Sequence, residues 1–559
     1  MLKFKQYKFS PFILILLLFA LPLLNLLTPG LPVTHDGIDH VARIANFYKN
    51  LEEGILIPRW AGNLNWGFGH PILMFLYPLP SYATSFFHFL GLNLIDSFKL
   101  FFASSFILSG IFMYLWLKEF LGKNAAILGA VLYLFAPYRF IDLYVRGAIG
   151  EHAAFVFMPL VLYALYKFNK KNRKQTGNYL RFLLVSISFA GLILSHNAIS
   201  LMFIPFIIFY TLYLFWEHKS KLKLVVCGLS LFLGFLFSFF FWFPAFMEGK
   251  YTLRDIVTQG EYSSRFVNPQ DLIFGSWNFG ISGQFSVQIG IVHIILVLLA
   301  ATFVIKQVLK KDKHNLLLLG SLIFLLFSIF LMTPESKFVW DKVTTLQKLQ
   351  FPWRFLSLIV FLTSLISAIF IAKIKLKDSS KKNLVVGILF FAAIFLTKDF
   401  WQAREYKLIP DSFFKTIYNG TTDTGESAPI WSVRFMEKRP KAEIELIEGS
   451  ASFKRVKRET THHEYEVTVN DRVRIRENTL YFPGWKVYDN GIEVKDVEFQ
   501  DPKNRGLITF YLDKGEHYLE LRFEETKLRT FANLVSGSSI FFAGLMFLIL
   551  KLRYGKSTK

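Results

Sequence analysis

The sequence contains one cysteine, Cys227, among its 559 residues. A single thiol excludes intramolecular disulfides and thiolate metal clusters, so we expect Cys227 to be a small core residue. The chain also lacks a Walker loop, a Rossmann glycine pattern, an HExxH motif and a GxSxG sequence after a strand. An ATP-driven pump and a nucleotide-sugar enzyme of soluble type therefore lack their usual anchor.

Acidic residues are also scarce: 41 Asp and Glu stand against 63 Lys and Arg, which gives a net charge of +22. In a soluble protein this imbalance would suggest a nucleic-acid partner. Here 53% of the residues are hydrophobic, and apolar runs such as 12–27 and 540–550 recur along the chain. With their flanks these runs approach the ~20 residues that a bilayer core requires. We therefore expect a membrane protein that binds the lipid bilayer and no nucleic acid.

The positive charge lies in short clusters between the apolar runs, which is the positive-inside pattern. Seven such clusters hold 27 Lys and Arg but only four Asp and Glu. We place them in the cytoplasm, which puts both termini on the cytoplasmic side of the cell membrane. The clusters are 1–9, 117–124, 167–181, 216–223, 305–314, 373–383 and 551–559.

The predicted fold class is a polytopic α-helical membrane protein with about twelve spans. The first apolar run resembles a signal peptide but has no clear cleavage site, so we expect it to remain as the first span. The predicted spans are 10–28, 98–117, 124–140, 152–167, 181–195, 198–216, 223–243, 286–305, 315–332, 354–373, 383–398 and 530–551.

Residues 72–92 are apolar enough to resemble another span. Counting them as one would move every later basic cluster to the outer side, and Pro78, Pro80 and His88 interrupt the run. We therefore interpret 72–92 as an interfacial or re-entrant part of a long first outer loop, 29–97.

The predicted domains are a transmembrane domain, 1–398, an extracytoplasmic domain, 399–529, and a final span with a basic tail, 530–559. The later part of the middle domain alternates apolar and polar residues, which predicts a β-sandwich of seven or eight strands after an irregular stretch, 399–440. Asp489-Asn490-Gly491 predicts a type I′ hairpin turn within it.

The first outer loop opens with a cluster of ionisable residues: His35, Asp36, Asp39, His40 and Arg43. If 36–52 is helical, Asp36, His40 and Arg43 share one face, and Asp39 can pair with Arg43. Two carboxylates and two imidazoles could bind a divalent cation or activate an acceptor hydroxyl. A capped, solvated surface helix explains the same residues.

A second cluster lies where the third span emerges and the fourth begins. Glu151 at a helix start interacts favourably with the helix dipole, so capping alone explains it. Capping does not explain Arg139 and Arg146, since positive charge is otherwise scarce on the outer side. Paired arginines suit phosphate or carboxylate ligands.

Two further residues lie at outer helix junctions. Arg354 follows Pro352 in the first turn of the tenth span, where it could bind phosphate or reach lipid headgroups with Trp353 in the aromatic belt. His196 lies in a Ser-His-Asn turn, which is more typical of a helix cap than of a binding site.

Several stretches resemble a known family. HDGIDH, FGHPILMFLYPLP, APYRFIDLYVRGAIGEH, SHN and FPWRF look like the bacterial membrane family labelled "6-pyruvoyl-tetrahydropterin synthase-related", although the chain shows no sign of a soluble pterin enzyme. The order of loops and acids resembles GT-C membrane glycosyltransferases, including the catalytic subunit of oligosaccharyltransferase. Residues 481–494 resemble the outer β-domain of large bacterial membrane proteins implicated in glycosylating envelope polymers.

The resemblance implies a function for these residues. Asp36 matches the catalytic acid of the first loop and Glu151 the acid of the second, with Mg²⁺ or Mn²⁺ as the cation that both would bind. We therefore expect inverting transfer from a polyprenyl-phosphate sugar to an envelope glycan or glycolipid on the outer side. Asp36 would deprotonate the acceptor, and Arg354, with Arg146 or Arg139, would hold the departing phosphate. His35, Asp39, His40 and His196 complete the expected substrate-binding set.

Two other functions fit part of the pattern. A lipid or glycan transporter would explain many helices, but it predicts inverted repeats and ionisable residues near mid-bilayer, whereas the acids here cluster at the outer boundary. A non-catalytic scaffold that binds envelope glycans through the β-domain would leave Asp36 and Glu151 dispensable. The β-domain itself could hold the acceptor or serve as a passive cap.

Overall fold

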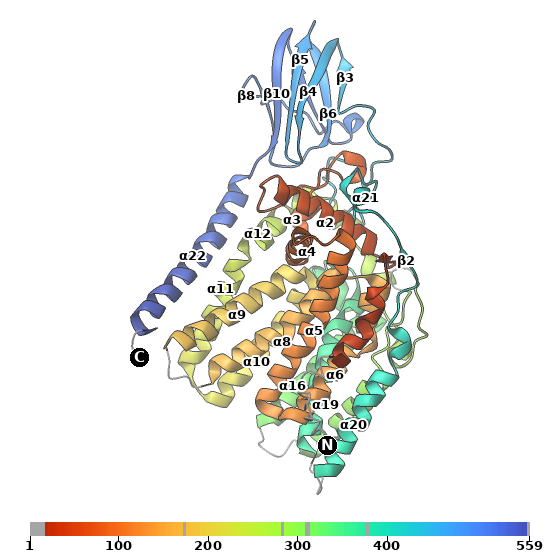
Figure 1. Cartoon of the computed structure of the whole chain (residues 1–559), viewed down its shortest axis with the longest axis vertical. Coiled ribbons are helices and arrows are strands. Elements are labelled where there is room, and N and C mark those ends of the chain that lie inside the picture. Colours follow the sequence, from red (N-terminus) through yellow and green to blue (C-terminus); the bar gives the residue numbers. More distant parts are fainter. Residues whose placement is uncertain (1–16, 171–174, 281–283, 308–312, 375–378, 556–559) are drawn as a thin grey trace, which may run out of the picture.

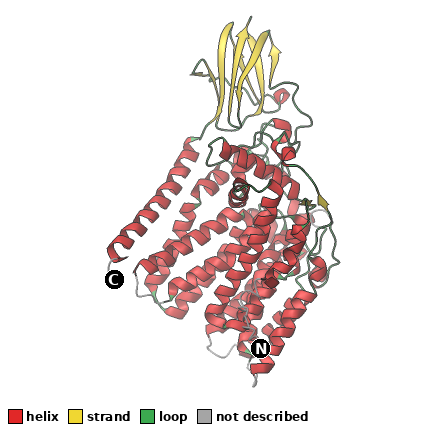
Figure 2. Cartoon of the chain, in the orientation of Figure 1, coloured by secondary structure: helices red, strands yellow, loops and turns green. Residues whose placement is uncertain are grey.

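The computed structural model describes residues 17–170, 175–280, 284–307, 313–374 and 379–555. A bundle of long helices carries a β-domain at one end, and several short helices lie between the two parts (Figures 1 and 2). The helices before the β-domain are α2 (Gly37–Glu52), α3 (Ile72–Phe75), α4 (Leu79–Phe89), α5 (Leu94–Leu121), α6 (Lys123–Leu134), α7 (Pro137–Phe140), α8 (Ile149–Asn169), α9 (Gln175–Ser195), α10 (Asn197–His218), α11 (Lys221–Phe237), α12 (Phe239–Met247), α13 (Arg254–Val257), α14 (Pro269–Ile273), α15 (Ile291–Gln307), α16 (Lys313–Met332), α17 (Lys337–Lys342), α18 (Thr344–Gln347), α19 (Leu356–Lys373), α20 (Ser379–Phe395) and α21 (Asp411–Lys415).

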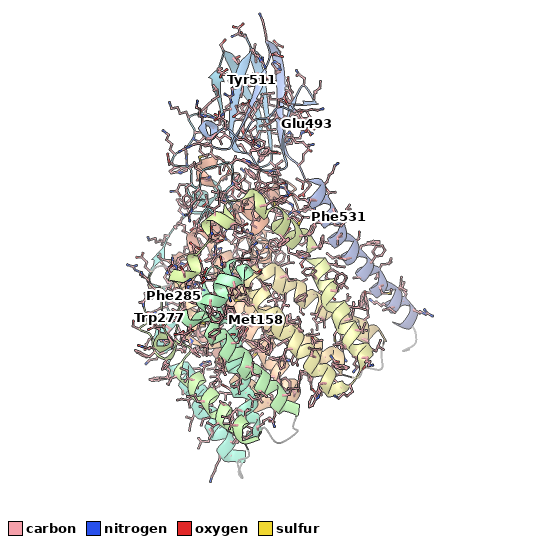
Figure 3. The ribbon with its side chains drawn as sticks, turned by 180° about the vertical axis from the view of Figure 1, so that it is seen from behind. Met158, Trp277, Phe285, Glu493, Tyr511 and Phe531 are labelled. Carbon is pink, nitrogen blue, oxygen red and sulfur yellow. The ribbon has the colours of Figure 1, made fainter. Side chains whose placement is uncertain are left out.

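Burial differs sharply between the helices of the bundle. Helix α19 packs against α6, α15 and α16 and is almost entirely buried. The last helix, α22 (Lys527–Gly555), is almost entirely exposed and stands at the outer edge, where Phe531 is labelled in Figure 3. Many of its exposed side chains are large and apolar, such as Phe531, Phe541 and Leu552, which suits a helix in contact with lipid.

Within the described residues, eight helices are long and apolar enough to cross a membrane, and two bent pairs bring the total to ten. The bent pairs occupy the predicted spans 124–140 and 223–243. The predicted spans 10–28 and 286–305 correspond to shorter apolar helices, Leu17–Leu27 and Ile291–Ile305; the start of the former lies outside the described residues. A polytopic helical membrane protein is therefore confirmed, whereas the number twelve stays a prediction.

Residues 72–92 form no span. They fold into α3 and α4, of 4 and 11 residues, which are too short to cross a bilayer. Helix α4 packs against α2 and α5. The prediction that this segment belongs to the first loop agrees with that arrangement.

Basic clusters that we predict to be cytoplasmic meet at one end of the bundle. Glu119, near the end of α5, pairs with Lys167 and Lys170 at the end of α8. Lys223, at the start of α11, donates to the carbonyl of Asn169. This end lies opposite the β-domain (Figure 1). The two ends of the bundle thus differ in charge, as the positive-inside pattern predicts. Which end faces the cytoplasm stays a prediction. The clusters 1–9 and part of 551–559 lie outside the described residues.

The β-domain consists of two antiparallel sheets that enclose one hydrophobic core. One sheet has the strand order β4-β5-β10-β7-β8 and the other β3-β6-β9, and the eight strands agree with the predicted number. Asn490 and Gly491 both have positive φ between β7 and β8, as the predicted type I′ turn requires. The strands are β3 (Ile444–Glu448), β4 (Ala451–Arg458), β5 (His462–Val469), β6 (Val473–Leu480), β7 (Trp485–Asp489), β8 (Ile492–Glu493), β9 (Leu507–Leu512) and β10 (Gly515–Phe523).

The first loop and the irregular stretch 399–440 lie together beneath the β-domain. Leu31–Pro32 (β1) pairs with Tyr406–Lys407 (β2) in a small antiparallel sheet. Trp60 of the first loop packs edge-on against Trp485 of β7, with ring centroids 5.5 Å apart. The long first loop therefore links the helical bundle to the β-domain.

Candidate functional site

Backbone hydrogen bonds join the first loop to the segment before α8. The N–H groups of His35 and Asp36 donate to the carbonyls of Val145 and Arg146, each over 2.9 Å. Gly147 follows with a φ of +69°, and a Cβ at this position would collide with the first loop. Glycine thus permits both the left-handed turn and the close approach. Two segments more than 100 residues apart in sequence meet here.

A buried carboxylate lies next to this junction. Glu151, in the first turn of α8, has an ion pair of 2.8 Å with Arg146. Its other oxygen accepts hydrogen bonds from Tyr138 over 2.9 Å and from Ser357 over 3.0 Å. Arg146 also pairs with Asp142 over 3.0 Å. Burial of a carboxylate is costly unless it is paired and hydrogen-bonded, and Glu151 meets both conditions.

Arg354 approaches the same carboxylate from the start of α19. Pro352 begins a 3-10 turn, Pro352–Phe355, that leads into this helix. The Arg354 Nε atom lies 3.9 Å from Glu151, and its Nη1 donates to the Leu349 carbonyl. The side chain is 15% exposed, whereas Glu151 is fully buried. We call these residues the Glu151 cluster: Tyr138, Asp142, Arg146, Glu151, Arg354 and Ser357.

Asp36 differs from every acid of the Glu151 cluster. It precedes α2 at the N-cap position, is half-buried, and makes no side-chain capping bond. Within the described ranges its carboxylate forms no hydrogen bond or ion pair, although its backbone N–H is held by Arg146. A carboxylate without a partner retains its capacity to accept a proton or a hydroxyl hydrogen bond.

The other polar residues of α2 pair differently from our expectation. Asp39 accepts a hydrogen bond of 2.8 Å from Tyr418, and Arg43 bonds His40 over 2.9 Å and Thr422. The predicted Asp39–Arg43 ion pair is therefore wrong. The 399–440 stretch supplies both new partners, and local helical spacing could not place it.

Burial shifts the pKa values around α2. Desolvation raises the pKa of Asp39, against the hydrogen bond from Tyr418 and the charge of Arg43, which lower it. Desolvation and Arg43 hold the pKa of His40 well below its usual value. Burial also lowers the pKa of His35, although Asp36 opposes this shift. Both imidazoles are thus neutral at pH 7 and can accept or donate hydrogen bonds.

Three other predicted site residues make no hydrogen bond or ion pair with the Glu151 cluster among the described residues. Two of them still lie near it, since Glu151 and Arg354 interact electrostatically with His196, and Arg146 with His35. His196 accepts a hydrogen bond of 3.3 Å from the Ile199 N–H, as the cap interpretation predicted, and its ring stacks on Tyr77 at 4.8 Å. The His35 ring lies 6.1 Å from that of Phe285. Arg139 is fully buried: it donates to Ser109 over 3.0 Å, and its guanidinium lies over aromatic rings, 3.9 Å from the Phe155 centroid. Among the described residues it has no ion pair with the Glu151 cluster, although its charge interacts with that of Asp142, a member of the cluster.

Sequence reasoning missed three members of the cluster as site residues: Tyr138, Asp142 and Ser357. Two of them had a usable signal. Asp142 precedes Arg146 by four residues, and Ser357 follows Arg354 by three, so each pair shares a helical face. Tyr138 offered no signal of its own, because an aromatic residue at a helix end is common in any membrane protein.

A metal ion has no evident set of ligands here. Among the residues that the structure describes, no three His, Cys, Asp or Glu side chains are placed to hold one. The oxygens of Glu151 already face Arg146, Tyr138 and Ser357. The divalent cation therefore stays a prediction, and we assign no role to it.

Comparison with known proteins gives one family match. A family model described as "6-pyruvoyl-tetrahydropterin synthase related domain; membrane protein" matches residues 73–406, which is more than half of the chain. A protein of Lactococcus lactis subsp. cremoris (strain MG1363), described only as uncharacterized, is 28% identical over 273 residues. That alignment covers 47% of this chain and 43% of the relative, so the chain matches less than half of its length.

Distant likenesses to solved structures also exist. Arabinofuranosyltransferase AftD from Mycobacteria has 14% identity and a TM-score of 0.44, over 69% of this chain and 26% of its own. ArnT from Cupriavidus metallidurans, bound to undecaprenyl phosphate, has 12% identity and a TM-score of 0.39, over 72% of this chain and 68% of its own. The Archaeoglobus fulgidus oligosaccharyltransferase has 12% identity and a TM-score of 0.41, over 72% of this chain and 53% of its own. Likenesses this distant do not establish a common fold or activity.

Proposed function

This chain belongs to the membrane-protein family described as 6-pyruvoyl-tetrahydropterin synthase related, and we propose that it is a membrane glycosyltransferase. It transfers a sugar from a polyprenyl-phosphate donor in the bilayer to a hydroxyl of an envelope glycan or glycolipid on the extracytoplasmic side. The β-domain and the Glu151 cluster face that side in this proposal, because the opposite end of the bundle carries the basic clusters.

One observation carries the proposal. The carboxylate of Asp36 has no partner among the described residues, and the backbone N–H of Asp36 donates to the carbonyl of Arg146. Arg146 in turn contacts Glu151, which Arg354 also approaches. An acceptor of protons and a partly exposed cation therefore belong to one connected group of residues. Transfer from a sugar phosphate requires both: a base for the acceptor and positive charge for the leaving group.

The proposed step uses Asp36 as general base. Its carboxylate takes the proton of the acceptor hydroxyl while that oxygen attacks the anomeric carbon of the donor sugar. The bond between this carbon and the phosphate oxygen breaks, and the electron pair leaves with the polyprenyl phosphate. Attack from the face opposite the phosphate inverts the anomeric configuration. The donor is already activated, so no ATP enters the step.

Arg354 stabilises the phosphate as its negative charge grows. It is the only arginine of the Glu151 cluster that exposes an appreciable part of its side chain, at 15%. Arg146 contacts both Asp142 and Glu151, and its guanidinium lies 4.4 Å from the ring of Trp353. We therefore assign Arg146 to positioning: it connects the Asp36 backbone with the carboxylate that approaches Arg354.

Reconstitution tests the proposal directly. The full chain is reconstituted in proteoliposomes that contain polyprenyl phosphates carrying a radiolabelled hexose or pentose. These donor lipids are placed in the leaflet that the Glu151 cluster faces. Donor cleavage is measured as release of polyprenyl phosphate, since water can substitute for an unidentified acceptor. We expect cleavage of at least one donor above the rate in protein-free vesicles.

Two results would contradict transfer. Movement of intact labelled lipid between leaflets without cleavage would identify a transporter. Binding of glycans with neither cleavage nor movement, for every donor tested, would identify a scaffold.

A further inference from the structure

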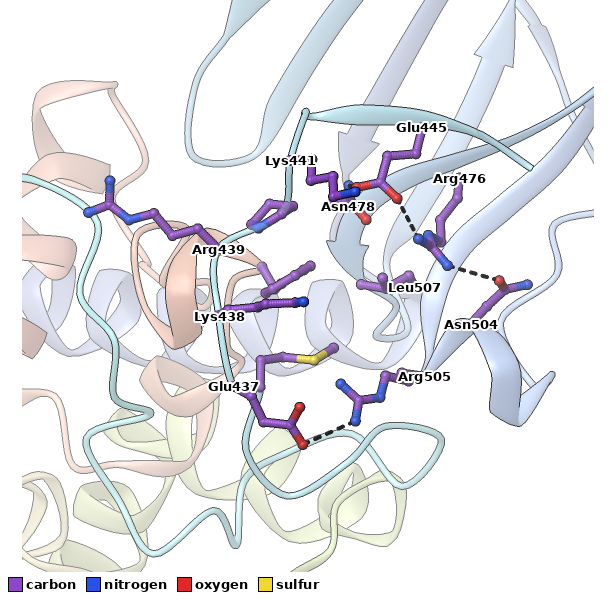
Figure 4. A pocket seen from close by; sticks show the side chains of 13 residues that line it. Glu437, Lys438, Arg439, Lys441, Glu445, Arg476, Asn478, Asn504, Arg505 and Leu507 are labelled. Carbon is purple, nitrogen blue, oxygen red and sulfur yellow. Dashed lines mark hydrogen bonds and ion pairs between the residues drawn. The ribbon is translucent and has the colours of Figure 1, made fainter. Parts of the chain in front are cut away.

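A second polar hollow lies away from the Glu151 cluster, at the base of the β-domain (Figure 4). Its volume is about 250 Å³, and it lies between the connecting segment 436–441 and strands of the smaller sheet. Phe68, Met436 and Leu507 form an apolar floor. Binding sites for drug-sized molecules occupy ~300–1,000 Å³, so this pocket suits a group about the size of one sugar ring.

Positive charge dominates the walls of this pocket. Five cationic side chains line it against only two carboxylates. The two carboxylates are already paired: Glu437 with Arg505 over 3.2 Å, and Glu445 with Arg476. The pocket therefore holds an excess of positive charge that these internal ion pairs do not neutralise.

Lys438, Arg439 and Lys441 supply this excess, and the two lysines are the ones that face the pocket. Within the described part of the chain neither has an ion pair, and both side chains extend toward the pocket, from opposite ends of one short loop (Figure 4). Arg439, between them, turns away and donates to the carbonyl of Ile417 over 3.4 Å. Two lysines without carboxylate partners, aimed into one hollow, form a site for negative charge.

The remaining wall is rich in hydrogen-bonding groups. Asn478 and Asn504 are buried, and Asn504 accepts a hydrogen bond of 3.3 Å from Arg476. The Asn478 amide donates to the Ala442 carbonyl over 2.7 Å and to Glu445 over 3.1 Å, which leaves its oxygen and the Asn504 NH2 group for a ligand. Arg505 has a φ of +53°, an unfavourable conformation for a residue with a side chain, and its guanidinium donates to Glu437. Amide groups above an apolar floor match a sugar ring, which presents hydroxyls at its edge and C–H groups on its face.

We propose that this pocket binds an anionic sugar residue, one that carries a carboxylate or a phosphate, within a glycan chain. The lysines contact the negative group, the amides contact hydroxyls, and the apolar floor contacts the ring. A glycerol phosphate headgroup would supply the same charge but has no ring for the floor to contact. Binding here does not require that the protein transfers sugars.

Binding of defined probes to the full chain in phosphatidylcholine nanodiscs tests this site. The probes are a trimer of galacturonic acid, the matching neutral trimer of galactose, and glycerol phosphate as the headgroup of an anionic lipid. We expect the acidic trimer to bind at least about tenfold more tightly than the other two. Equal affinity for the neutral trimer, or equal affinity for glycerol phosphate, would overturn the proposal.

Charge-reversal variants locate the binding. The double variant Lys438→Glu/Lys441→Glu is expected to weaken binding of the acidic trimer by about tenfold or more. Lys514→Glu is the matched control, because Lys514 follows β9, whose other end lies at the pocket, about 17 Å along the strand. An equal loss in the control, or no loss in the double variant, would contradict the assignment.

Two controls keep the result interpretable. Both lysines are exposed, so the double variant should melt as the wild type does; if it does not, the alanine pair Lys438→Ala/Lys441→Ala replaces it with the same expected direction. Asp36→Asn should retain full affinity for the acidic trimer. A failed transfer assay would thus remove the proposed enzyme activity and leave this site standing.

Discussion

Two buried glutamates, Glu151 in the helical bundle and Glu477 in the β-domain, have nearly the same surroundings. Each is fully buried and pairs with an arginine, Arg146 over 2.8 Å and Arg458 over 2.7 Å. Each also contacts a tyrosine hydroxyl. By burial and pairing alone the two sites are equivalent.

Their connections differ. The partners of Glu477 come from its own domain: Arg458 on β4, and His463 and Tyr465 on β5. Arg146 and Tyr138 come from the segment just before Glu151, and Ser357 comes from α19. This network also adjoins the partly exposed Arg354, and the carbonyl of Arg146 accepts the backbone N–H of Asp36. A closed network explains stability, whereas an open one also offers chemistry. This contrast separates a structural carboxylate from a functional one.

The largest effect is expected at Asp36. If this carboxylate is the base, Asp36→Asn should lower the rate of donor cleavage by about 10²–10⁴-fold. The melting temperature should not change, since the Asp36 side chain has no partner to lose among the described residues. Glu52→Gln, an exposed acid at the other end of α2, is the control and should leave cleavage unchanged. Full activity in Asp36→Asn would remove the base from our proposal.

The two glutamates themselves sharpen the comparison. Loss of one partner of a buried ion pair costs about 3–5 kcal/mol. Glu151→Gln and Glu477→Gln should therefore both lower the free energy of unfolding, each by about 3 kcal/mol. Only Glu151→Gln should also reduce donor cleavage per folded molecule, because Glu151 approaches Arg354. Folded fractions are measured by size exclusion and cleavage is normalised to them.

A loss of specific activity in Glu477→Gln as large as in Glu151→Gln would erase the distinction. It would mean that the β-domain network communicates with the site. Unchanged specific activity in both variants would show that neither network positions a reacting group.

Acid should destabilise the β-domain through Glu477. Burial raises the pKa of this carboxyl, but Arg458 and His463 outweigh it and lower the pKa to about 2 from an ordinary 4.5. The stabilisation is present above pH 4.5 and is lost as pH falls toward 2; it amounts to about 3 kcal/mol at 1.36 kcal/mol per unit. Burial lowers the pKa of His463, so its contribution is lost in the same direction, below pH 6.5.

Urea unfolding at several pH values measures this loss. Unfolding of the β-domain is detected by limited proteolysis, from the release of peptides that belong to β5 and β6. In Glu477→Gln the part of the loss between pH 4.5 and 2 should disappear. An undiminished loss in this variant would assign the acid sensitivity to other groups.

Local sequence features predicted most of the fold. The bent pairs and the eight long helices coincide with predicted spans. The length of an apolar run and the position of basic clusters are both properties of short segments, so they can be found in the sequence. The hairpin at Asn490 and Gly491 was predictable because its turn type depends on two residues. Even the exclusion of 72–92 depended on local prolines and on the position of later lysines.

The candidate site was predictable only in part. Asp36, Glu151 and Arg354 were chosen because charged groups at a membrane boundary are costly. Arg354 does approach Glu151, whereas Asp36 connects to them only through its backbone hydrogen bond to Arg146. The partners of Asp39 and Arg43 were not predictable, since Tyr418 and Thr422 lie in an irregular stretch nearly 380 residues later. Long-range pairing depends on tertiary packing, which local periodicity does not encode.

The smallest effect concerns Arg354 and distinguishes binding from positioning. If this arginine contacts the donor phosphate, Arg354→Gln should raise the KM for the donor by about tenfold, which is the loss expected for one charged hydrogen bond. Thermal stability should fall little, because Arg354 is partly exposed and lies 3.9 Å from Glu151, beyond hydrogen-bonding distance. Arg354→Lys keeps the charge and should recover part of the KM. A large loss of stability with an unchanged KM would instead place Arg354 with Arg458 of the β-domain, as a residue whose charge serves only to balance a buried carboxylate.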